Sequence, residues 1–182
     1  MTHRPIDPGP LAQVSLEATG DRWTLVFVRE LPHPPAKVWQ ALTDPAQVGE
    51  WAPYTVDRNL GSIGEATLTM VDGDTAEPMS ATVLRAGEPR LLEHTWGDDL
   101  LRWVLTPTET GTRLTLRHTL AERDWTPRVA AGWHICLVVA QRLLDGDPVG
   151  PIRGEAAREH GWDELPQSYA GRLGIVLDPM VP

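Results

Sequence analysis

Two histidines, His94 and His118, stand where the sequence places an imidazole inside the protein. Each lies in an alternating apolar series, Leu92-His94-Trp96 or Leu114-Leu116-His118-Leu120. Because alternate residues of a strand share one face, both rings are expected to point inward. An imidazole in an apolar cavity can orient a carbonyl or phenol, or move a proton near neutral pH. The alternative, a hydrogen-bonded polar residue near a strand end, is favoured for both, so no catalytic residue is predicted beyond these two candidates.

The sequence indicates neither a metal site nor a cofactor. His94, His118 and His134 fall on separate predicted elements, and none has a second His or Cys at the spacing of metal ligands. The chain also lacks a glycine-rich phosphate loop, a GxSxG elbow and an HExxH motif. We therefore predict no metal and no cofactor.

Tryptophan is abundant in this chain, with eight Trp against one Phe. Its large flat ring with a single N–H donor suits both a packed core and the wall of a ligand pocket. We expect three strand faces, a long helix and the tip of a short helix to enclose one internal ligand-binding pocket. Its predicted lining is Trp51, Leu68, Met70, Trp96, Trp103, His118 and Trp133. That these side chains simply fill the core remains an open alternative.

Composition limits the class of protein and its partners. The formal charge is −9, with 25 acidic and 16 basic residues, and the arginines are scattered. Such a chain is expected to bind neither nucleic acid nor an anionic membrane surface. No apolar run is long enough to span a bilayer, and the N-terminus lacks the apolar segment of a signal peptide. The single cysteine, Cys136, excludes a disulfide framework, and we predict a reducing cytoplasmic location.

The longest helical signal covers Thr126–Leu144. Thr126 is predicted to cap this helix, and Pro127 suits the first helical position. Apolar residues recur every three or four positions, which makes one face that should pack on a sheet. We expect Trp133 and Cys136, on that face, to be buried opposite Leu114, Leu116 and His118. The stripe consists of Val129, Gly132, Trp133, Cys136, Leu137, Ala140 and Leu144.

Most of the chain before this helix has the alternation of β-strands. Pro35–Thr43 is predicted to be a short helix, and Asp44 to cap a second one that starts at Pro45. The fold class is therefore α+β: a curved antiparallel sheet of six or seven strands around a long C-terminal helix, with two short helices after the first full strand. The expected strands are Leu11–Ala18, Trp23–Leu31, Glu65–Val71, Pro78–Ala86, Arg90–Trp96, one through Leu101, Trp103 and Leu105, and Leu114–Leu120.

The domain organisation follows from these elements. Residues 1–10 contain three prolines and are expected to form a loose arm. Residues 11–146 should form one domain. Residues 147–182 are polar with scattered apolar side chains, and should form short helical turns packed on the domain.

Three segments together resemble the heat-shock-protein-90 ATPase activator homologue family of small bacterial proteins, within the START-like (SRPBCC, birch-pollen-allergen-like) superfamily. The resemblance covers Trp23 to Gly146, and its most specific feature is the spacing of Trp39, Leu42, Asp44-Pro45 and Trp51. It implies a helix-grip fold whose cavity, between helix and sheet, often binds a hydrophobic small molecule. It supplies no shared catalytic residues. The segments are GDRWTLVFVRELPHPPAKVWQALTDPAQVGEWAP, GEPRLLEHTW and GWHICLVVAQRLLDG.

Three functions are compatible with the sequence. The first is binding of a small hydrophobic ligand in the cavity, without catalysis. The second is an enzyme of cyclase or hydratase type that uses His94 or His118. The third is a chaperone-interacting protein that acts through its surface. A homodimer is compatible with each of them.

Overall fold

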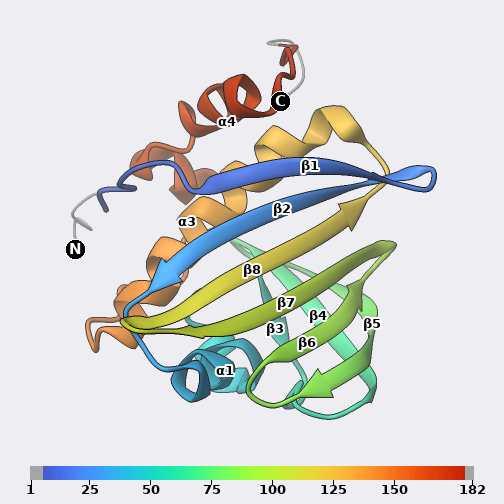
Figure 1. The fold of residues 1–182 in the computed structure, drawn as a ribbon, viewed down its shortest axis with the longest axis vertical. Helices are drawn as coiled ribbons and strands as arrows, with labels where there is room; N and C mark the ends of the chain where they lie inside the picture. The colour runs from blue at the N-terminus through green and yellow to red at the C-terminus, as the bar shows by residue number, and fades with distance from the viewer. Residues whose placement is uncertain (1–5, 179–182) are drawn as a thin grey trace.

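The computed structural model describes residues 6–178, which form an eight-stranded antiparallel sheet curved around one long helix (Figure 1). The strand order is β1-β2-β8-β7-β6-β5-β4-β3, so neighbours in sequence pair except where β8 inserts beside β2. The strands are β1 (Gln13–Thr19), β2 (Arg22–Leu31), β3 (Tyr54–Val56), β4 (Gly64–Asp72), β5 (Thr75–Gly87), β6 (Leu91–Trp96), β7 (Asp99–Thr108) and β8 (Gly111–Leu120).

Helix α3 (Thr126–Leu144) has the predicted bounds, but its predicted cap is wrong. Trp125 occupies the cap position, and the Thr126 hydroxyl, already in the first turn, donates to the carbonyl of Arg123 at 2.7 Å. The Asp44 cap is confirmed, because its carboxylate accepts the Ala46 N–H at 2.9 Å. The remaining helices are α1 (Pro35–Thr43), α2 (Pro45–Val48), α4 (Leu165–Leu173) and the 3₁₀ segments η1 (Arg123–Trp125) and η2 (Gly154–His160).

The predicted helix-grip architecture is confirmed, with eight strands instead of six or seven. The missed strand is β3, which pairs with β4 through Tyr54 opposite Met70. Three residues are too few to show alternation, and so β3 has no signature in the sequence.

The predicted register of the last strand is also confirmed. Leu114, Leu116 and His118 are buried, while Arg113 is exposed. On the facing helix, Trp133 and Cys136 are buried. The concave face of the sheet therefore packs on α3 through the side chains that were predicted from the strand alternation and from the helical stripe.

The two ends of the described chain are joined by hydrogen bonds. We call residues 6–12 the N-terminal arm. The N–H of Ile6 donates to His160 Nδ1 at 2.9 Å, and the N–H of Ala12 to the Tyr169 hydroxyl at 2.9 Å. Helix α4, which carries Tyr169, packs on α3 and β1 (Figure 1). The expectation of a loose arm did not anticipate these bonds, and residues 1–5 lie outside the described residues.

Among the described helices, none combines the length and the apolar character needed to cross a bilayer.

Candidate functional site

The space between the sheet and α3 is filled largely by aromatic rings. Trp51 and Trp103 pack edge to face with ring centroids 6.0 Å apart, and Trp103 meets Trp133 in the same way at 5.3 Å. Trp51, Trp103 and Leu68 are at most 1% exposed. Since edge-to-face contacts are favourable and fill volume, these three predicted pocket residues belong to the packed interior.

His94 is locked within this interior. Its Nε2 accepts the indole N–H of Trp103 at 3.2 Å, so Nδ1 carries the proton and donates to the carbonyl of Thr95 at 3.1 Å. Burial lowers the pKa of His94 to about 4, because desolvation penalises the imidazolium. At neutral pH the ring is uncharged, and both of its nitrogens are engaged.

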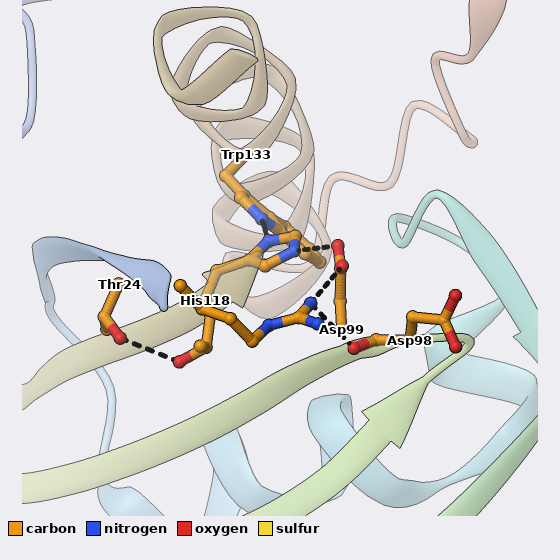
Figure 2. Close-up of polar contacts among 7 residues, drawn as sticks. Thr24, Asp98, Asp99, His118 and Trp133 are labelled. Atoms are coloured by element: carbon orange, nitrogen blue, oxygen red, sulfur yellow. Dashed lines mark hydrogen bonds and ion pairs between the residues drawn. The ribbon is translucent and has the colours of Figure 1, made fainter. Parts of the chain in front are cut away.

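His118 links α3 to the beginning of β7 (Figure 2). The indole N–H of Trp133 donates to His118 Nδ1 at 2.9 Å, which leaves the proton on Nε2, and Nε2 donates to Asp99 Oδ2 at 2.7 Å. The other Asp99 oxygen accepts from Arg22 Nη2 at 3.3 Å. His118 therefore positions Trp133 and has no ring nitrogen free to act as a base.

A cavity of about 220 Å³ opens beside this network, and we call it the aromatic pocket. Three of the seven predicted residues line it: Trp96, His118 and Trp133. Met70 does not; it is 37% exposed and lines a neighbouring cavity of about 430 Å³, the outer pocket. The full lining of the aromatic pocket is Pro53, Trp96, Asp99, His118, Trp125, Val129, Gly132, Trp133 and Cys136.

Trp96 supplies an unused donor to the aromatic pocket. Its ring packs against Tyr54 at 5.2 Å and Trp133 at 6.0 Å. Its Nε1 is buried and has no hydrogen-bond partner among the described residues. Because most buried polar groups are paired, this orphan N–H, on a ring that lines the cavity, is a candidate donor to an occupant.

Gly132 creates space on the helical side. A Cβ atom built at this position would meet nothing within 4 Å. Pro53, Gly132 and Cys136 line both the aromatic and the outer pocket, so the two cavities share a wall. Burial raises the pKa of the Cys136 thiol to about 12, and a neutral thiol is a poor nucleophile. Cys136 therefore contributes an apolar surface.

Sequence reasoning missed several lining residues. Asp99 is the first residue of β7, and its carboxylate binds His118. The proximity of Asp99 to His118 follows from the pairing of β7 with β8, which places Leu100 opposite Thr119. Val129 and Gly132 were on the predicted helical stripe, so their spacing was a usable signal. In residues 6–178, no cluster of three or more His, Cys, Asp or Glu could hold a metal.

A family model described as "Activator of Hsp90 ATPase homolog 1-like protein" matches residues 32–143. The crystal structure of CalU16 from Micromonospora echinospora is similar, with a TM-score of 0.64, 21% identity, and coverage of 88% of this chain and 95% of that chain. Protein MLL2253 from Mesorhizobium loti has a TM-score of 0.59 at 26% identity, covering 69% and 99%.

The AHSA1-like protein from Aeromonas hydrophila has a TM-score of 0.58 at 16% identity, covering 68% of this chain and 92% of that chain. A search of curated proteins found no significant match. These structures show the helix-grip fold, and the match over residues 32–143 spans α1 to α3. The chain belongs to the family of activator of Hsp90 ATPase homolog 1-like proteins, within the START-like superfamily.

Proposed function

We propose that this protein binds a small, flat, mainly apolar molecule that carries one hydrogen-bond acceptor, in the aromatic pocket. The observation that carries the proposal is the buried, unpartnered indole N–H of Trp96 at a cavity walled by three tryptophans. A ligand carbonyl or hydroxyl oxygen would satisfy this donor, while the rings of Trp125 and Trp133 would cover the ligand's faces.

The charges around the aromatic pocket favour a neutral ligand. Asp99 is the acidic residue of the lining, and it already accepts from His118 and Arg22. An anionic ligand would be repelled by this carboxylate. Because His118 uses both ring nitrogens, Trp96 is the donor proposed to orient the ligand.

The size of the aromatic pocket favours a ligand of one or two rings. Its volume of about 220 Å³ lies below the common range for drug-sized ligands. A longer molecule would extend past Gly132 into the outer pocket of about 430 Å³. The family and its fold support a ligand-binding type of domain in general.

The two alternatives have less support. An enzyme that uses His94 or His118 would first have to release the bonds of Trp103 or Trp133. A chaperone partner is suggested by the family's description alone. The exposed large apolar residues lie on separate elements, for example Ile63 before β4, Leu84 on β5 and Val176 after α4.

Calorimetric titration with acetophenone and ethylbenzene tests the proposal, since the two have similar shapes and only acetophenone carries an acceptor. Both should bind, acetophenone more tightly. Trp96→Phe removes the donor and keeps most of the ring, so it should weaken acetophenone by about tenfold and leave ethylbenzene nearly unchanged. Trp23→Phe is the matched control, because Trp23 packs against Arg123 and lines none of the pockets described.

Two results would contradict the proposal. If neither compound binds below millimolar concentration, the aromatic pocket is not a site for this class of ligand. If Trp96→Phe weakens both compounds equally, the indole N–H does not orient the ligand, and its ring acts only as a wall.

A further inference from the structure

Arg29 is a charged residue on the apolar face of β2. Leu25, Phe27 and Leu31 share this face and are at most 3% exposed. Arg29 follows the same period of two, so its side chain enters the layer between sheet and helix. There its Nη2 donates to the side-chain oxygen of Gln141 on α3 at 3.0 Å.

Arg29 has no counter-ion in the described part of the chain. No carboxylate of residues 6–178 lies within 4.0 Å of its guanidinium, and its Nε is buried without a hydrogen-bond partner. Desolvation lowers the pKa of Arg29, although the group stays protonated. A partly buried cation without an anion is destabilising, which identifies this position as one that an anion would complete.

A cavity of about 510 Å³ lies beside Arg29 under the N-terminal arm, and we call it the arm pocket. It exists because β1 pairs with β2 only as far as Gln13 opposite Val28. Before Gln13, Pro8 and Pro10 cannot donate ladder bonds, and the arm leaves the sheet. His134 Nε2 donates to the carbonyl of Pro8 at 2.6 Å and holds the arm away from β2.

The acidic residues of the arm pocket already have donors. Asp7 accepts the N–H of Gly9 at 2.9 Å. Glu30 accepts from Arg113 at 2.6 Å, and Asp145 is 2.6 Å from His33 Nε2. Of the two guanidinium groups that line the arm pocket, Arg142 pairs with Asp147, whereas Arg29 has no adjacent carboxylate among the described residues.

We propose that the arm pocket binds a small organic carboxylate, whose anionic group pairs with Arg29. Val28, Val138 and Leu11 supply apolar wall for its hydrocarbon part. The arm pocket and the aromatic pocket have no lining residue in common. The two sites also differ in their donors, since the aromatic pocket offers the neutral indole N–H of Trp96 and the arm pocket offers the guanidinium of Arg29. This site is therefore independent of the proposed function.

Sodium benzoate and benzyl alcohol, at equal ionic strength set with sodium chloride, test the arm pocket in the full-length protein. Benzoate should raise the thermal midpoint and shift the Arg29 Nε–H signal in ¹H–¹⁵N spectra, and benzyl alcohol should do neither. Arg29→Met should weaken benzoate by about tenfold or more, the usual effect of losing a hydrogen bond to a charged group. Arg117→Met, on the opposite face of the sheet, is the matched control.

The stability of the ligand-free variants separates a binding role from a structural one. If Arg29 serves a ligand, ligand-free Arg29→Met should unfold at the wild-type midpoint or above it, because a desolvated cation has been removed. A lower midpoint together with lost benzoate binding would show that Arg29 is structural and overturn the proposal. So would stabilisation by inorganic phosphate but not by benzoate, or an unshifted Arg29 signal. Trp96→Phe should leave benzoate binding unchanged, which separates this test from that of the aromatic pocket.

Discussion

The indole N–H of Trp133 donates to Nδ1 of His118 at 2.9 Å, which joins the centre of α3 to β8 through two side chains. Both residues are nearly inaccessible to solvent, with exposed fractions of 3% and 2%. The bond fixes the tautomer of His118 and, through it, the contact with Asp99. One hydrogen bond thus sets the orientation of two of the side chains that wall the aromatic pocket.

Trp133→Phe should destabilise the protein by about 1–3 kcal/mol beyond the loss of packing, because His118 Nδ1 would be buried without a donor. His118→Leu alone should leave the indole N–H of Trp133 unpaired, at a similar cost. The double variant should be less destabilised than the sum of the two, since neither orphan group remains. Denaturant unfolding of the four proteins gives the coupling energy. Strict additivity would mean that the bond contributes nothing to stability.

His94 should make stability fall as pH falls. Its folded pKa of about 4 lies below the ordinary value of 6.5, so the unfolded chain takes up a proton that the native protein does not. The loss begins as pH falls through 6.5 and ends near pH 4. By linkage it amounts to about 3 kcal/mol over that window.

His94→Gln keeps an acceptor for Trp103 but does not titrate. The free energy of unfolding of this variant should therefore decline less between pH 7 and pH 4 than that of the wild type. Burial also lowers the pKa of His134, which adds a slope of the same sign to both proteins. Identical pH profiles would show that His94 does not contribute to acid sensitivity.

Gly132→Ala should stabilise the protein by up to about 1 kcal/mol and weaken acetophenone binding. Glycine is unfavourable within a helix, and the added methyl group meets no atom within 4 Å. The methyl group would instead occupy space shared by the two pockets. Gly171→Ala on α4 is the matched control, because its Cβ is also unobstructed and Gly171 lines neither pocket. Unchanged acetophenone affinity in Gly132→Ala would place the ligand elsewhere.

Trp39→Ala should cost about 3–5 kcal/mol of stability, the usual range for truncating a buried aromatic. The side chain is 3% exposed, on the inner side of α1. Chemical denaturation measures the effect, and Trp125→Ala, with a side chain 40% exposed, should cost far less. A wild-type midpoint for Trp39→Ala would exclude Trp39 from the core.

The sequence alone predicted the fold correctly wherever a hydrophobic period repeated several times. The stripe on α3 and the alternation on β8 fixed which faces meet, and both were confirmed. The strand without repetition was missed, because β3 has only three residues. The faint alternation of Leu11–Ala18 was enough to predict β1, which covers Gln13–Thr19.

The candidate site was less predictable than the fold. A pattern that places a side chain in the interior does not show whether that side chain lines a pocket or fills the core. Trp51 and Trp103 point inward as expected, yet they pack on each other and leave no space between them. Asp99 and Trp125 reach the aromatic pocket from the ends of elements, where periodicity ends. Arg29 lies within an apolar strand, where the sequence gives no sign of a site. It is identified by the lack of a counter-ion in the structure.

The bonds of the N-terminal arm also constrain the order of folding. The contacts of Ile6 with His160 and of Ala12 with Tyr169 span 154 and 157 positions, among the most non-local in the chain. During synthesis the arm emerges before the strands of the sheet, whereas its partners on η2 and α4 emerge after every strand. Docking of the arm therefore has to follow the synthesis of the whole sheet. In pulse-labelled hydrogen exchange, the amide of Ala12 should gain protection after the amides of β8.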